Sequence, residues 1–342
     1  MLHPHESLRD QHSRQATRDV SSVPTLAPAG PFLASRSPGF RSAIAQLERF
    51  AKQGNDHVLL LGESGTGKTV FAERLHACSP RADRIFHRVS LASVTDTLAP
   101  SALFGHLPGA FTDARSKRAG HFITAHGGTL FLDEIGKASE VVQARLLDAV
   151  ERNEIVPLGA DRSVRIDVRI VAATNVDLHD LVDQGKFLPD LLARLDGFAV
   201  RIPPLRERRD DIALLVAHLV SVRHERYGYR KAPTIDSDLM EALCGADWPG
   251  NVRELDVTVR RLLVDAQGAP IITLGHCTDS LLYLRPSKAT RATPDEVLAE
   301  VRKDGNVAGV ARKFGLSRTT VYRYMQNAAV VAAAAIATDL AM

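Results

Sequence analysis

A glycine-rich segment directly after a short apolar run constrains this chain more than any other feature. The run covers residues 57–61, and after it come Gly62, Glu63, Ser64, Gly65, Thr66, Gly67, Lys68 and Thr69. Because glycine has no side chain to clash, successive backbone N–H groups can turn towards phosphate oxygens. In this spacing the lysine reaches the β- and γ-phosphates, and the threonine hydroxyl holds Mg²⁺. The segment predicts a phosphate-binding loop between a buried strand and a helix; the alternative is a glycine-rich turn with an incidental Lys-Thr pair.

Two acidic residues, Asp133 and Glu134, follow a second apolar run at 129–132. In an enzyme with a phosphate-binding loop, the first acid of such a pair holds Mg²⁺ and the second polarises the attacking water. We therefore assign Asp133, with Thr69, to the metal and Glu134 to the catalytic base; the alternative is a surface acidic pair. Asn175 ends a later strand, where it either senses the γ-phosphate, orients water or serves only as a turn residue.

The order of the segments predicts an α/β fold, a parallel sheet with helices on both faces. The expected helices cover residues 40–51, 68–76 and 140–152. The expected strands cover residues 57–61, 85–89, 129–132 and 164–172, the last as a buried parallel strand. A loop-rich insertion is expected at 100–118, and only helices between 210 and 267.

Composition sets the domain boundaries and excludes some classes of protein. No apolar run approaches the ~20 residues that span a bilayer, and the N-terminus has no signal-peptide core, so we expect a cytoplasmic protein without a membrane partner. Cys78, Cys244 and Cys277 lie far apart and are expected to be reduced. The predicted segments are a flexible leader at 1–31, an α/β part at 32–204, a helical lid at 205–270, a linker at 271–293, a helix-turn-helix at 294–327 and an Ala-rich tail at 328–342.

The segment before the tail has helix-turn-helix spacing. Asn306 starts a helix that ends at Gly315, and Ser317 is a suitable N-cap for the next helix. That second helix would enter the major groove of double-stranded DNA. The side chains expected to face base edges or phosphates are Arg318, Thr319, Thr320 and Arg323. A plain helical hairpin is the alternative, and Tyr322 and Tyr324 fit either a core or a backbone contact.

Taken together, these segments resemble the AAA+ ATPase domain of bacterial enhancer-binding activators that remodel sigma-54 RNA polymerase. The resemblance covers residues 32–267, and the C-terminal segment is similar to the Fis-type DNA-binding segment of these activators. The matching stretches are residues 62–69, 103–106, 109–112, 127–136, 173–175, 203–208 and 248–255. The resemblance implies ATP and Mg²⁺ as cofactors, and enhancer DNA and sigma-54 polymerase as partners.

The resemblance also assigns roles to single residues. Arg253 would be the lid arginine that contacts the nucleotide of its own subunit. Arg194 would be an arginine finger that reaches the neighbour's ATP, which implies a ring, usually a hexamer; without the resemblance, a surface ion pair is the simpler interpretation. Phe111 and Thr112 would lie in the loop that contacts sigma-54 polymerase.

Several positions depart from the family's pattern, among them Leu107 and Pro108 in place of the usual Glu-Lys pair. Asp113 replaces a glycine in the polymerase-contacting loop, and Ser90 replaces an asparagine that restrains the catalytic glutamate. Leu188 replaces the first of two arginines, so only Arg194 remains, and a related subunit in a mixed ring would supply the other. ATP binding is the firmest expectation. The leading hypothesis is a sigma-54 activator controlled by its expression level, a partner protein or the short leader. The alternatives are a regulator that keeps ATP and DNA binding without sigma-54 contact, and an AAA+ remodeller unrelated to transcription.

Overall fold

The computed structural model describes residues 34–54, 56–112, 114–277, 294–313, 321 and 325. A parallel five-stranded sheet, in the order β2-β3-β6-β1-β7, forms the centre of the N-terminal part. Its strands are β1 (Val58–Leu61), β2 (Phe86–Ser90), β3 (Thr129–Asp133), β6 (Arg169–Thr174) and β7 (Ala199–Arg201). All six residues of β6 are buried, as expected for an internal strand of a parallel sheet covered on both faces.

Helices cover both faces of the sheet, because alternate strand residues point to opposite sides. On one face α1 (Pro38–Ala51) and α2 (Lys68–Ala77) pack through Leu47 and Phe71 against Val58 and Leu60 of β1. The opposite face carries α3 (Ala99–Phe104), α4 (His121–Thr124), α5 (Glu140–Arg152) and α7 (Pro189–Leu195). Each large apolar side chain buried in these layers contributes ~1.5–3 kcal/mol.

A buried arginine joins the first helix to the sheet. Arg169, at the start of β6, is fully buried and donates to the backbone carbonyls of Phe50, Ala51 and Asp56. These carbonyls lie at and beyond the C-terminal end of α1, where helical partners run out and a cation is favourable. Burial lowers the pKa of the Arg169 guanidinium to about 10.

Two sequence-based expectations need correction in this part of the chain. The expected loop at 100–118 begins with the buried helix α3. The expected single strand at 164–172 is two strands: β5 (Val164–Arg165) pairs antiparallel with β4 (Glu154–Ile155), and β6 begins only at Arg169. Both β5 residues are exposed, whereas β6 is wholly buried, which explains why the sequence alternates first and becomes continuously apolar later. The remaining helix of this part is α6 (Leu178–Asp183).

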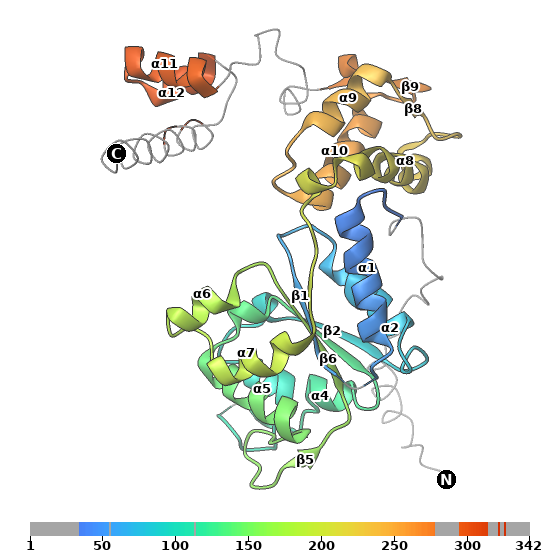
Figure 1. Ribbon diagram of the computed structural model, residues 1–342. Helices are drawn as coiled ribbons and strands as arrows, with labels where there is room; N and C mark the ends of the chain where they lie inside the picture. Colours follow the sequence, from blue (N-terminus) through green and yellow to red (C-terminus); the bar gives the residue numbers. More distant parts are fainter. Residues whose placement is uncertain are drawn as a thin grey trace, which may run out of the picture.

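The lid is a helical layer with a small sheet at its edge. It contains α8 (Ile212–Arg223), α9 (Ser237–Gly245) and α10 (Asn251–Asp265), which Figure 1 shows as a second body beside the α/β part. The expectation of helices alone is wrong, because β8 (Thr234–Ile235) pairs with β9 (Ile271–Ile272). Ile272 and Cys277 are buried in the lid core, so residues 271–277 pack with the lid and not as a linker.

The described part of the C-terminal segment contains two helices, α11 (Pro294–Asp304) and α12 (Val307–Lys313). Asn306 Oδ1 accepts from the Gly309 N–H, as an N-cap does. Four valines form its core: Val297, Val301, Val310 and Val321. The residues expected to face DNA lie outside the described residues, as do Gly315, Ser317, Asp113 and the leader.

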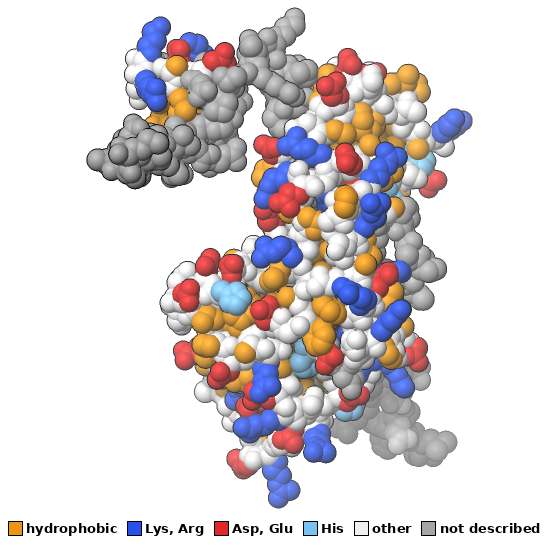
Figure 2. Space-filling model, in the orientation of Figure 1, with side chains coloured by type: hydrophobic (Ala, Val, Ile, Leu, Met, Phe, Trp, Pro, Cys, Tyr) orange, Lys and Arg blue, Asp and Glu red, His pale blue; other side chains and the backbone are white. Residues whose placement is uncertain are grey.

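The surface charges are mixed in sign, and the cysteines are not joined by disulfides. On the face in Figure 2, basic and acidic side chains are interspersed over the described residues, in keeping with a net charge of only +3. The three cysteines all lie in the described ranges and form no disulfide. In those ranges, no helix combines the length and the apolar character needed to cross a membrane.

Candidate active site

A cleft of about 430 Å³ opens where the carboxyl ends of β1, β2, β3 and β6 meet the lid. Parallel strands bring their carboxyl ends to one edge, which is where ligands bind in open α/β sheets. The predicted residues that line this cleft are Ser64, Gly65, Gly67, Lys68, Thr69, Asp133, Glu134, Asn175 and Arg253. The structure therefore brings together residues that lie up to 189 positions apart in the chain.

The loop between β1 and α2 has the backbone that its glycines allow. Gly65 and Gly67 have φ of 80° and 106°, in the left-handed region that favours glycine. Gly62 is needed for space, since a Cβ there would lie 3.0 Å from Thr66 Oγ1. The side chains of Glu63 and Thr66 do not line the cleft: Thr66 donates to the Glu63 carbonyl across the loop.

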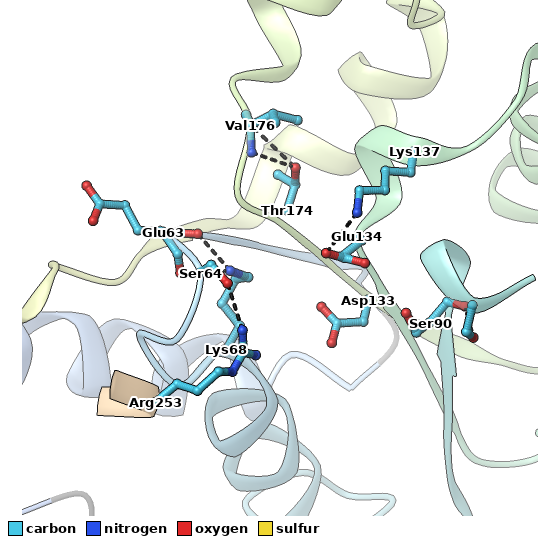
Figure 3. Close-up of polar contacts among 12 residues, drawn as sticks. Glu63, Ser64, Lys68, Ser90, Asp133, Glu134, Lys137, Thr174, Val176 and Arg253 are labelled. Atoms are coloured by element: carbon cyan, nitrogen blue, oxygen red, sulfur yellow. Dashed lines mark hydrogen bonds and ion pairs between the residues drawn. The ribbon is translucent and has the colours of Figure 1, made fainter. Parts of the chain in front are cut away.

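Lys68 is the first residue of α2, and its ammonium is held inside the loop. Nζ donates to the carbonyls of Gly62 and Glu63 at 2.7 and 3.0 Å (Figure 3). Burial lowers the pKa of Lys68, and the charges of Asp133 and Glu134 oppose that shift. The ammonium thus lies between the loop and the two acids, at the end of the helix that favours anions.

Each of the two acids pairs with a cation that the sequence did not reveal. Asp133 Oδ2 accepts from an Arg88 guanidinium N–H at 3.0 Å. Glu134 Oε1 accepts from Lys137 Nζ at 3.2 Å (Figure 3). Glu134 has φ of 60°, a left-handed conformation that costs a non-glycine residue ~1–2 kcal/mol. This turn ends β3 and directs the two neighbouring carboxylates differently. Ser90 lines the cleft beside them, opposite Asp133 in the strand register.

The lid contributes one side of the cleft. Arg253, in the first turn of α10, donates to Ser64 Oγ at 2.8 Å, so its guanidinium already reaches the loop (Figure 3). Arg223 of α8 and Asp256 of α10 also line the cleft and form an ion pair at 2.5 Å. Sequence analysis missed this pair because its two residues lie on different helices.

The lid and the phosphate-binding loop are joined by a polar junction. Asn251 Nδ2 donates to the Ser64 carbonyl at 3.0 Å, and the Val252 N–H donates to the Gly65 carbonyl at 3.0 Å. Arg206 adds two bonds to the carboxylate of Glu63, at 2.6 and 2.8 Å. A Cβ at position 65 would lie 2.2 Å from the Gly250 carbonyl oxygen. Gly65 therefore serves this junction as well as the loop's own backbone.

A buried arginine adds further contacts to that junction. The Arg208 guanidinium donates to the Thr66 carbonyl at 3.0 Å and lies 4.0 Å from the centroid of the Phe40 ring. Burial lowers the pKa of Arg208 to about 10. The stretches at 203–208 and 248–255, matched above only by resemblance, thus hold the lid against the loop.

The predicted arginine finger lies elsewhere. Arg194, at the end of α7, lines a second cleft of about 590 Å³ at the amino ends of β1, β6 and β7. There its guanidinium pairs with Glu151 of α5 at 2.8 Å. Leu188 precedes α7 and packs against the sheet's core, where its N–H donates to Gln143 Oε1.

The loop predicted to contact the polymerase is exposed. Its base is closed by paired backbone bonds between His106 and Arg118. Phe111 is 38% exposed, and its ring lies edge-on to His106 with centroids 4.9 Å apart. Thr112 is also exposed.

The fold and this cleft define a phosphate-loop ATPase domain of the AAA+ class. Comparison with known families agrees: residues 33–201 match the sigma-54 interaction domain, and residues 206–294 match an AAA+ ATPase lid domain. A fold likeness to an Hsp104 assembly, with a TM-score of 0.50 at 17% identity, supports the AAA+ architecture alone.

Individual relatives indicate which family within the AAA+ class the chain belongs to. The chain is 35% identical over 323 residues to the transcriptional regulatory protein ZraR of Salmonella typhimurium, covering 89% of this chain and 71% of that protein. It is 45% identical over 235 residues to the Nif-specific regulatory protein of Azotobacter vinelandii, covering 69% of this chain and 44% of that protein. NtrX from Brucella abortus, solved in complex with ADP, has a TM-score of 0.69 at 28% identity, covering 86% of this chain and 69% of that one. The chain belongs to the AAA+ family of sigma-54-dependent transcriptional activators.

Proposed function

We propose that this chain is an ATP-dependent, sequence-specific DNA-binding activator that remodels sigma-54 RNA polymerase through an AAA+ ring. The observation that carries the proposal is the cleft where Lys68, Asp133, Glu134 and Arg253 converge. NtrX, a solved relative, has been captured with ADP and with ATP. We place the same class of ligand in this cleft, with its phosphates on the loop at 62–69.

In this proposal the residues of the cleft have separate roles in ATP hydrolysis. Thr69 and Asp133 offer the oxygen donors that Mg²⁺ prefers, and the ion supplies charge neutralisation at the phosphates. Glu134 accepts the proton of the attacking water, Asn175 orients that water or senses the γ-phosphate, and Arg253 contacts the nucleotide from the lid. Lys68 provides positive charge to the β- and γ-phosphates.

We further propose that Arg194 acts on the ATP of a neighbouring subunit. It lies at the amino ends of the strands, whereas its own nucleotide cleft lies at the carboxyl ends. Its ion pair with Glu151 does not oppose this role strongly, because Arg194 is 60% exposed there and exposed pairs are worth only ~0–1 kcal/mol. A guanidinium on a transferring phosphoryl group lowers the barrier by far more. A ring, either of this chain alone or mixed with a related subunit, meets the requirement.

The contact with sigma-54 polymerase rests on the exposed Phe111 and Thr112, together with the family to which the chain belongs. The test is transcription from a sigma-54 promoter by purified components. Phe111→Ala should abolish activation while leaving ATPase activity, and Val141→Ala, an exposed apolar residue on α5, is the matched control. Full activation by Phe111→Ala would contradict the proposal.

The alternative is a regulator that binds ATP and DNA without sigma-54 contact. It is favoured by Asp113, because the resemblance described above implies a glycine at this position. Asp113→Gly separates the two readings. If only this variant activates the sigma-54 promoter, the wild-type chain works through the alternative.

DNA binding is proposed from the residue pattern at Arg318, Thr319, Thr320 and Arg323. Arg323→Ala should weaken binding of the cognate site by ~1–3 kcal/mol if it reads a base. Affinity is measured by fluorescence anisotropy at fixed salt, because phosphate contacts alone make binding salt-dependent. An unchanged affinity would exclude Arg323 from recognition.

A further inference from the structure

We propose that Arg88 is the counter-ion of Asp133 when the cleft holds no metal, and that its positive charge opposes the binding of Mg²⁺ at the same carboxylate. Arg88 is thus a positioning residue that sets how strongly nucleotide binding depends on the metal. The inference rests on the proposed binding of Mg²⁺ and nucleotide at this site.

The position of Arg88 follows from the sheet. Arg88 lies on β2 opposite Phe131 of β3, and Asp133 is two residues further along β3, on the same face of the sheet. The guanidinium lies 5.8 Å from the centroid of the Phe131 ring, and its Nη2 lies 3.0 Å from Asp133 Oδ2. Arg88 therefore lies along the surface of the strand, with its cationic end on the carboxylate assigned to Mg²⁺.

Arg88 and Mg²⁺ would lie as two cations beside one carboxylate. Mg²⁺ takes carboxylate oxygens as ligands. One Arg88 N–H already occupies Asp133 Oδ2, and Arg88 lines the same cleft as Thr69, so its charge would repel the ion. The Asp133 side chain is only 17% exposed, so water screens this repulsion only in part.

The consequence is a defined change in metal dependence. Without metal, Arg88 neutralises Asp133 and so reduces the repulsion between that acid and a nucleotide phosphate. With metal, the positive charge of Arg88 beside Asp133 weakens the binding of Mg²⁺. Both effects make the ratio of the nucleotide dissociation constant in EDTA to that in excess Mg²⁺ smaller than it would be without Arg88.

The experiment measures this ratio for the full chain with a fluorescent ADP analogue. Arg88→Gln should raise the ratio about two- to fivefold, the range expected for losing a half-exposed ion pair. Arg88→Lys, which keeps the charge, should stay near the wild-type value. Arg84→Gln, a 66% exposed residue just before β2, is the control and should not change it.

The outcomes separate the inference from the proposed function. If the wild-type chain binds ADP in Mg²⁺ but Arg88→Gln keeps the wild-type ratio, the inference is overturned and the nucleotide site stands. An equal rise of the ratio in Arg88→Lys would also overturn it, since general damage to the cleft and not the loss of charge would explain it. If the wild-type chain binds no ADP with or without Mg²⁺, the proposed function fails and the inference fails with it.

Discussion

The two clefts lie at opposite ends of one parallel sheet, and they differ in the groups that line them. The cleft at the carboxyl ends is built from the loops that follow β1, β3 and β6, and it contains the start of α2. The cleft at the amino ends is lined by the segments that precede β1, β6 and β7, together with four arginines. Those four arginines are Arg81, Arg152, Arg165 and Arg194. Only the first cleft offers backbone N–H groups from a glycine-rich loop and a helix start.

If Arg194 acts on the nucleotide as proposed, this difference means that one chain cannot complete its own site. The strand ends fix which loops meet, so Arg194 cannot lie beside Lys68 within one subunit. A nucleotide held in the first cleft can receive Arg194 only from another copy or a related chain. The comparison therefore predicts that the two clefts act on the same nucleotide only across a subunit boundary.

The largest expected effect tests whether Arg194 acts across a subunit boundary. Arg194→Ala should lower ATP turnover by ~10³–10⁵-fold, as for other arginine fingers, while Arg152→Ala in the same cleft should not. Lys68→Ala should also be inactive, because it loses nucleotide binding. Mixing the Arg194→Ala and Lys68→Ala chains should restore part of the phosphate release. No recovery in the mixture, with both chains assembled, would place Arg194 outside the reaction.

Glu134→Gln separates binding from chemistry within the first cleft. The amide keeps the shape of the side chain but cannot accept a proton, so turnover should fall by ~10²–10⁴-fold. Affinity for ATP should stay close to that of the wild-type chain. Both quantities are measured on the same preparation, by phosphate release and by nucleotide fluorescence. Unchanged phosphate release would remove Glu134 from the role of base.

A smaller effect is expected at the lid edge of the first cleft. Arg253 bonds Ser64 of the loop, so Arg253→Ala should weaken nucleotide binding by ~1.5–3 kcal/mol, a typical loss for a hydrogen bond to a charged group. The measurement is the dissociation constant in excess Mg²⁺. Arg260→Ala, also on α10 but outside the cleft, is the control. Equal affinities of Arg253→Ala and Arg260→Ala would contradict a nucleotide contact by Arg253.

The smallest effect concerns stability at the amino-end cleft. His57 accepts a hydrogen bond from the Ile170 N–H at Nδ1, and burial lowers the pKa of His57 from 6.5. The folded chain therefore binds this proton less readily than the unfolded chain, so the free energy of unfolding should fall as the pH drops below about 6.5. Thermal unfolding between pH 7.5 and 5.5 measures it, and His57→Gln should make the curve flatter. Equal slopes for both chains would contradict the assignment.

Short, contiguous patterns in the sequence predicted many of the residues that line the first cleft. The glycines around Lys68 and the acids after an apolar run are contiguous patterns, so their positions at strand ends were predictable. The expected helix at 140–152 agrees with α5 residue for residue. The division of residues 164–172 into two strands was not predicted, because an apolar pattern does not identify its partner strand.

Most of the residues that were missed have partners distant in the chain. Arg88 and Asp133 lie 45 positions apart, and Arg206 and Glu63 lie 143 apart. Neither arginine stands in a pattern that points to a charge partner. Lys137 is closer, three residues after Glu134, but the left-handed turn at Glu134 decides where that carboxylate points.

The sequence by itself determined which chemical groups the first cleft contains: a phosphate-binding loop and two acids after a strand. It also determined the α/β order of the segments. These depend on short-range backbone geometry and on which side chains can hold a charge. The tertiary structure alone decided which cations face those acids, how the lid is fixed to the loop, and that Arg194 lies at the far end of the sheet. Strand order and helix packing set those distances, and both result from burial of apolar faces over the whole chain.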